Sequence, residues 1–202
     1  MEDLAKSDTW RVFRIMAELV EGFEALSNIG PAVTIFGSAR LQPGSEYHTK
    51  CVKVAEDLAR SGFAIISGGG PGIMEAANRG AARAGGKTIG MNIALPQPQE
   101  PHAYITPELS FTFQYFFMRK VLLTYKSRAV VICPGGYGTL DEFFEIITLV
   151  QTSKISKKEM SVVLYGGDYW RQVIDFQNLV KLNAISAEDL CLFKVCSSPR
   201  EA

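Results

Sequence analysis

Five short runs of apolar residues alternate along the chain with segments in which apolar positions recur every three or four residues. Each run is continuously apolar, which is typical of strands that helices cover on both faces. The pattern therefore predicts a parallel sheet. Its expected strands are Ala32–Phe36, Phe63–Ser67, Thr88–Ile93, Ala129–Cys133 and Val162–Tyr165.

The intervening segments have the periodicity of amphipathic helices. Helices are expected over Ser45–Arg60, from about Gly72, over Gln114–Ser127 and over Thr139–Gln151, where Leu140, Phe143, Phe144, Ile147 and Val150 should point inward. The stripe of the second helix consists mainly of alanine and glycine, so this helix should lie very close to its sheet. The alternation predicts a Rossmann-like α/β fold: a doubly wound parallel sheet flanked by helices on both faces.

Other segments have weaker signals. Leu109–Phe113 reads as a short strand or an irregular lead-in, and Cys191–Val195 as a further edge strand. Four prolines make Leu95–Glu108 a loop, expected near the site because such sheets bind ligands at the carboxyl ends of their strands. An apolar stripe from Trp10 to Val20 marks an amphipathic N-terminal helix.

The composition narrows the domain organisation, partners and location that we expect for this chain. With 202 residues, of which 47% are hydrophobic, the chain is expected to form a single domain over residues 1–202. Its 21 basic and 21 acidic side chains cancel, so partnership with nucleic acid or a membrane surface is not expected. No apolar run approaches the roughly 20 residues of a membrane span, and a signal peptide is not recognisable. The expected ligand is a small molecule and the expected location is the cytoplasm.

The four cysteines, Cys51, Cys133, Cys191 and Cys196, form no C-x-x-C pair, and only two histidines are available to join them. Zinc sites need closely spaced ligands, so no metal site is predicted. Buried, reduced thiols are expected instead.

The most informative segment is Cys133–Glu142, which joins the end of an apolar strand to a helix through three glycines. We call residues 133–138 the second glycine turn. Backbone N–H groups in such a turn bind anions at the positive end of a helix. The turn is therefore a candidate phosphate site, with Glu142 as a candidate acid or base one helical turn further on.

A similar cluster at residues 67–72, the first glycine turn, also lies between a strand and a helix. It lacks the Gly-Lys-Ser/Thr of a Walker A loop, and neither turn fits the dinucleotide fingerprint. Two incomplete phosphate loops favour a mononucleotide over NAD or ATP hydrolysis. The alternative is that these glycines only make tight turns.

Four charged side chains near these turns have two interpretations each. Glu142 is either a capping-box residue, with Thr139 as N-cap, or a group that faces the pocket. Arg119 and Lys120 belong either to a solvated helix face or to the site. Arg40, just after the first strand, either lies on a surface loop or reaches a ligand.

Three motifs together resemble the Lonely Guy (LOG) family of nucleotide phosphoribohydrolases, whose members have often been labelled lysine decarboxylases. They are Gly68-Gly69-Gly70-Pro71-Gly72-Ile73-Met74-Glu75, Phe117-Met118-Arg119-Lys120, and Pro134-Gly135-Gly136-Tyr137-Gly138-Thr139-Leu140-Asp141-Glu142. The resemblance runs from about Phe36 to Gln151 and is to the longer bacterial branch. Pro98 stands where that branch usually has an acidic residue, and Glu100 is a candidate replacement.

The resemblance implies hydrolysis of the N-glycosidic bond of a nucleoside 5′-monophosphate, AMP or N6-substituted AMP, to a free base and ribose 5-phosphate. It implies no cofactor and a homodimer whose partner helix often completes the pocket. Position by position, it implies Arg119 and Glu142 as the catalytic pair. The implied substrate-binding residues are Ser38, Gly70, Met74, Lys120, Gly135, Gly136, Tyr137, Gly138, Thr139 and Thr148.

Two other functions stay open. A non-catalytic nucleotide-binding protein, or one like the molybdenum-cofactor carriers, would keep the same turns without hydrolysis. A decarboxylase would need a Schiff-base lysine and a pyridoxal phosphate site, and no lysine has a suitable context.

Overall fold

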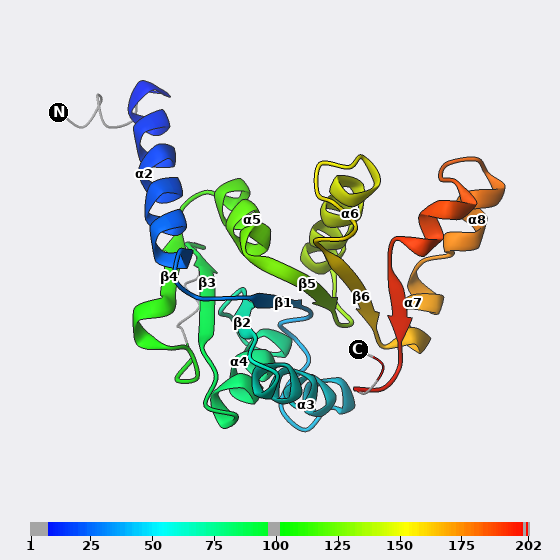
Figure 1. The fold of residues 1–202 in the computed structure, drawn as a ribbon, viewed down its shortest axis with the longest axis horizontal. Coiled ribbons are helices and arrows are strands. Elements are labelled where there is room, and N and C mark those ends of the chain that lie inside the picture. Colours follow the sequence, from blue (N-terminus) through cyan, green and yellow to red (C-terminus); the bar gives the residue numbers. More distant parts are fainter. Residues whose placement is uncertain (1–7, 97–101, 200, 202) are drawn as a thin grey trace.

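The computed structural model describes residues 8–96, 102–199 and 201. Within these residues one sheet contains seven strands, all parallel (Figure 1). The strands are β1 (Ala32–Phe36), β2 (Ala64–Ser67), β3 (Thr88–Ile93), β4 (Ser110–Phe113), β5 (Ser127–Ile132), β6 (Ser161–Tyr165) and β7 (Lys194–Cys196).

The strand order is β4-β3-β2-β1-β5-β6-β7, so the direction of winding reverses between β1 and β5. These two central strands are paired from Val33 opposite Ala129 to Phe36 opposite Ile132. Their loops diverge at the carboxyl edge, where ligands bind in doubly wound sheets.

Helices cover both faces of the sheet, as the sequence predicts. In Figure 1, α3 (Glu46–Arg60) and α4 (Ile73–Arg83) lie on one side, and α5 (Phe116–Tyr125) and α6 (Tyr137–Gln151) on the other, with α2 (Asp8–Leu26) beside α5. The remaining helical segments are η1 (Pro107–Leu109), α7 (Gly167–Val173), α8 (Phe176–Lys181) and η2 (Ala187–Cys191). The expected Rossmann-like fold is confirmed.

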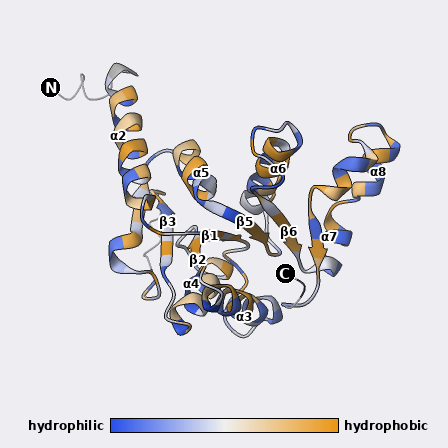
Figure 2. Ribbon diagram, in the orientation of Figure 1, coloured by the Kyte–Doolittle hydropathy of each residue, from blue (hydrophilic) through white to orange (hydrophobic). Residues whose placement is uncertain are grey.

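The sheet separates two hydrophobic cores, which explains why its strands are continuously apolar. Phe36 of β1 faces the core that contains Leu122 and Phe143, whereas its neighbour Ile35 faces the core that contains Cys51 and Ala77. Alternate residues of one strand thus reach opposite faces. Figure 2 shows apolar strands at the centre, with more polar residues on outer helices such as α8, although α2 is largely apolar.

Helix α4 packs unusually close to α3. A Cβ atom added at Gly80 would lie 2.2 Å from the carbonyl oxygen of Val52, so only glycine fits there. Ala76, Ala77 and Ala81 are fully buried on the same helix. The small-residue stripe thus allows a close approach, but at Gly80 the close neighbour is α3, whereas the sequence predicted closeness to the sheet.

Several details differ from the sequence-based expectations. The last strand is Lys194–Cys196 rather than Cys191–Val195, because residues up to Cys191 form η2. Cys191 is exposed, whereas the other three thiols are buried. Phe144 is 43% exposed although its periodicity places it inward.

Two further observations concern regions discussed above. The lead-in at Leu109 is resolved into η1 followed by the short strand β4. Pro98 and Glu100 lie outside the described residues. Among the helices of the described residues, none has the length and apolar character needed to cross a membrane.

Candidate functional site

A cleft of about 570 Å³ opens at the carboxyl edge of β1 and β5, where the winding reverses. The loop after β1, the loop after β5 and the helices α4, α5, α6 and α7 all contribute to its wall. Its lining includes Ser38, Arg40, Met74, Phe116, Arg119, Gly135, Gly136, Tyr137, Gly138, Thr139, Glu142 and Tyr169. Most of the predicted site residues are thus brought together.

The second glycine turn forms the floor of this cleft. Helix α6 begins at Tyr137, with Gly136 as its N-cap and no described side chain on its first N–H groups. A Cβ atom added at Gly136 or Gly138 would meet no described atom within 4 Å. The turn is therefore open at these two glycines beside the positive end of the helix, an arrangement that suits an anion.

Neighbouring residues hold this turn in place. The Ser38 N–H donates to the Pro134 carbonyl (3.0 Å), which joins the loops after β1 and β5. The Tyr169 hydroxyl donates to the Gly135 carbonyl (2.5 Å). A Cβ atom added at Gly135 would lie 2.1 Å from Thr139 Oγ1. The side chain of Thr139, in the first turn of α6, therefore packs directly against Gly135.

The start of α6 decides between the two readings of Glu142. Thr139 is the third residue of the helix and is buried, so it is not the N-cap that a capping box requires. The capping-box reading is wrong. Glu142 instead lines the cleft.

The first glycine turn is built differently. A Cβ atom at Gly69, whose φ is +73°, would lie 2.4 Å from Asn92 Oδ1, and one at Gly72, with φ +70°, would lie 2.4 Å from the Ser38 carbonyl oxygen. None of residues 67–72 is among the described residues that line the cleft, but Met74, in the helix that follows the turn, is. Gly70 is buried and is not among the residues that line the cleft.

The first turn does position Arg119, which reaches the cleft from α5. Its Nε donates to the Met91 carbonyl (2.7 Å) and its Nη2 to the Gly68 carbonyl (3.4 Å). Burial lowers the pKa of Arg119, while the nearby Glu142 raises it. The guanidinium is thus fixed by backbone carbonyls and directed at the same cleft as the carboxylate.

Glu142 has an altered acidity. Burial raises its pKa to about 7, against the opposing attraction of Arg119. A carboxyl group with this pKa exchanges a proton near neutral pH, which suits general acid or base chemistry.

Lys120 and Thr148 lie apart from the described lining. Lys120 Nζ is 2.9 Å from Asp141 Oδ2 and 2.5 Å from Glu145 Oε2, so it links α5 to α6 beside Glu142. The Thr148 hydroxyl donates to the Phe144 carbonyl (2.6 Å) on its own exposed helix face. Their predicted contact with a nucleotide stays a prediction.

Sequence reasoning missed Tyr169, which both lines the cleft and anchors Gly135. The available signal was its position shortly after β6, at the carboxyl edge of the sheet. Phe116 and Ile93, which add apolar wall, were also missed, whereas Leu95 belongs to the loop that was expected near the site. Arg40, whose role the sequence left open, lines the cleft.

The fold and the cleft together define a Rossmann-like protein with a candidate anion site at its topological switch point. A family model described as possible lysine decarboxylase matches residues 74–202. The chain belongs to this family, which includes the LOG proteins. A second model, described as DNA recombination-mediator protein A, matches residues 19–103, less than half of the chain.

Curated relatives agree with the family assignment. The chain is 28% identical over 151 residues to a cytokinin riboside 5′-monophosphate phosphoribohydrolase of Rhodococcoides fascians, covering 72% of this chain and 73% of that protein. It is 27% identical over 154 residues to the rice (Oryza sativa) protein LOG, covering 76% of this chain and 62% of the rice protein. The chain thus spans less than two thirds of the rice relative's length.

Solved structures agree with the fold. A molybdenum cofactor binding protein from Rippkaea orientalis has a TM-score of 0.60 at 21% identity, covering 84% of this chain and 90% of that one. The molybdenum cofactor carrier protein of Chlamydomonas reinhardtii has a TM-score of 0.59 at 21% identity, covering 85% and 92%. These similarities establish the architecture alone.

Proposed function

We propose that this protein hydrolyses the N-glycosidic bond of nucleoside 5′-monophosphates, AMP or N6-substituted AMP, to free base and ribose 5-phosphate. The main support is the cleft itself, which combines an open glycine turn with Glu142, a carboxyl group of pKa about 7, and Arg119. The phosphoribohydrolase names of the curated relatives support the same reaction.

The 5′-phosphate binds at the N-terminus of α6, where Gly136 and Gly138 leave the N–H groups accessible. Gly135, Tyr137, Thr139 and Ser38 belong to the same binding region, and Met74 contacts the nucleotide from α4. Anchoring the phosphate holds the ribose in register, so binding energy from a non-reacting group is used for positioning.

Glu142 acts on the sugar. Cleavage of the glycosidic bond develops positive charge on the ribose, and a carboxylate stabilises that charge or orients the attacking water. Arg119, held by the carbonyls of Met91 and Gly68, orients the carboxylate or polarises the leaving base. The chemistry uses only these side chains and water, and we propose no cofactor or metal.

We further propose that the protein is a cytoplasmic homodimer. Large apolar side chains are exposed along α2 and α5: Trp10, Phe13, Met16, Val20, Phe116, Phe117, Val121 and Tyr125. Exposed apolar patches of this kind mark protein interfaces. An interface on this side would bring a partner next to Phe116, which lines the cleft.

Replacement of Glu142 tests the function. Wild-type protein is incubated with AMP, GMP, CMP and N6-isopentenyl AMP, and the free base is measured. Glu142→Gln should bind AMP nearly as well as the wild type but lose at least about 10²-fold in turnover, the scale for removal of an acid, base or electrostatic group. Glu145→Gln is the matched control, because Glu145 lies on the same helix outside the cleft lining. Unchanged release of adenine by Glu142→Gln would refute the assignment.

The second candidate function is nucleotide or molybdenum-cofactor binding without hydrolysis. The solved structures of similar fold support it, since two are of proteins named for binding or carrying that cofactor. Tight binding of nucleotides by the wild type without release of base from any of the four substrates would favour this function.

A further inference from the structure

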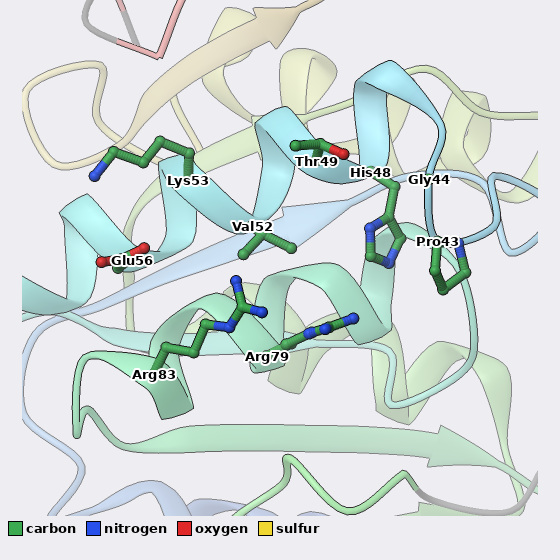
Figure 3. Close-up of a pocket in the computed structure, with 9 residues that line it drawn as sticks. All are labelled: Pro43, Gly44, His48, Thr49, Val52, Lys53, Glu56, Arg79 and Arg83. Carbon is green, nitrogen blue, oxygen red and sulfur yellow. The ribbon is translucent and has the colours of Figure 1, made fainter.

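A second cavity, a groove of about 460 Å³, lies between α3 and α4 (Figure 3). It shares no lining residue with the cleft among the residues that the structure describes. Its lining consists of Pro43, Gly44, His48, Thr49, Val52, Lys53, Glu56, Arg79 and Arg83. The close contact at Gly80 and Val52 brings the two helices together at this groove.

Two arginines, one helical turn apart, form the α4 wall. Figure 3 shows the side chain of Arg83 extending toward Val52 and that of Arg79 running along the groove toward His48. Like charges at this spacing repel, which costs stability unless an anion lies between them. Arg83 is exposed, and within the described part of the chain it forms no ion pair.

Two contacts hold the side chain of Arg79 in position. Its guanidinium lies 5.6 Å from the centre of the Tyr104 ring, and its Nη1 is 3.9 Å from Glu75 Oε1. A cation above an aromatic ring is orientationally restrained. The guanidinium therefore needs little further ordering to bind an anion in the groove.

The acidic groups nearby already have cationic partners. Glu56 is paired with Arg60 (2.5 Å), and Glu75 contacts His48 Nε2 (2.6 Å) as well as Arg79. Lys53, on the α3 wall, is paired with Asp57 (2.8 Å) but is 53% exposed. The charge without a counter-ion thus belongs to Arg83, next to a weakly paired Arg79.

We propose that this groove binds a small molecule that carries a diphosphate group. Arginine guanidinium groups bind phosphate oxygens with paired, directional hydrogen bonds. Two arginines one helical turn apart match a ligand with two linked phosphates better than a ligand with a single phosphate. The groove is larger than a bare diphosphate, and Val52 and Pro43 offer apolar contacts for an attached nucleoside. The proposal does not rest on the function proposed for the cleft.

Calorimetric titration with pyrophosphate tests the proposal. The wild type is compared with Arg79→Gln/Arg83→Gln and with the control Arg128→Gln/Arg171→Gln, which loses the same charge at exposed positions outside the groove. The groove variant should bind pyrophosphate at least about tenfold more weakly than the wild type, because a charge-assisted hydrogen bond to each phosphate is lost. The control should match the wild type.

Further titrants identify the source of the diphosphate. Inorganic phosphate should bind the groove more weakly than pyrophosphate. ADP that binds the wild type more tightly than pyrophosphate does, with that binding weakened in Arg79→Gln/Arg83→Gln, would indicate a nucleoside diphosphate in the groove. Arg83→Gln alone, at an exposed and unpaired position, guards against misfolding of the double variant and should show a several-fold loss. Equal binding by all variants, or an equal loss in the control, would overturn the proposal. A glycine turn that binds pyrophosphate in the cleft would contribute equally to every variant.

Discussion

The two glycine turns look alike in sequence but differ in structure. In the first, residues 67–72, added Cβ atoms at Gly68, Gly69 and Gly72 would collide with Arg119, Asn92 and the Ser38 carbonyl. In the second, added Cβ atoms at Gly136 and Gly138 would meet no described atom within 4 Å. Glycine is thus a packing requirement at all three of these positions in the first turn, whereas the second turn needs it for packing only at Gly135 and is open at Gly136 and Gly138.

This difference gives the two turns different roles: the first supports other parts of the site, and the second is the candidate binding turn. The first turn supplies a carbonyl to Arg119 and lies beneath the loop that follows β1. The second turn presents the start of α6 to the cleft. Substitutions in the two turns should therefore change different properties of the protein.

The largest expected effect is on stability, from Gly72→Ala. The residue has φ +70° and its new Cβ atom would lie 2.4 Å from a backbone oxygen, so the free energy of unfolding should fall by about 3 kcal/mol. Gly138→Ala, in the first turn of α6, should change it by less than about 1 kcal/mol, and toward greater stability. Urea denaturation measures both, and AMP binding should weaken in Gly138→Ala. Equal stability of the two variants would end the distinction between the turns.

Gly68→Ala is expected to act on catalysis. Its Cβ atom would lie 2.3 Å from Arg119 Nη2 and 2.7 Å from Met74 Sδ, both ends of flexible side chains that can move. The fold should survive, but base release should fall at least about tenfold as Arg119 is displaced. In the Arg119→Ala background the same substitution should add little, because the two changes remove one interaction. Additive losses would show that Gly68 acts independently of Arg119.

The smallest expected effect is a pH dependence of base release, caused by Glu142 in the helix that follows the second turn. Burial raises the pKa of Glu142 to about 7, so its ionised, active form increases as pH rises through that value. Base release should therefore increase about tenfold from pH 6 to pH 8, following the ionised fraction. A pH–rate profile of kcat/KM measures this rise, and the residual activity of Glu142→Gln should lack it. A wild-type profile that falls over this range would mean that the protonated acid is the active form.

Much of the fold was predictable because both faces of the sheet are buried. Continuous apolar runs placed β1 and β3 at their observed bounds, and Ser45 marked the start of α3. Periodicity failed at Phe144, an apolar residue that lies on the exposed face of α6 with Asp141 and Thr148. A sequence pattern does not distinguish an apolar face that packs on the sheet from one that is exposed.

The candidate site was predictable in its motifs and less so in its details. Glu142 and Arg119 line one cleft because they follow or face the switch point between β1 and β5. The first glycine turn looked equally suited to phosphate, and only its packing against Asn92 and Ser38 separates the two turns. The role of Tyr169 depends on a contact across 34 residues of sequence, which no local pattern contains.

Helix α2 lies beside α5, yet it supports the element that carries Arg119. Glu18 Oε1 accepts a hydrogen bond from the Gln114 N–H (2.8 Å), two residues before α5 begins. Further along α2, Gly22 allows Leu122 of α5 to pack against its backbone. A shortened protein that starts at β1 would keep every described strand and cleft residue. Helix α5 would lose these contacts with α2, and the Arg119 guanidinium would be less firmly positioned in the cleft.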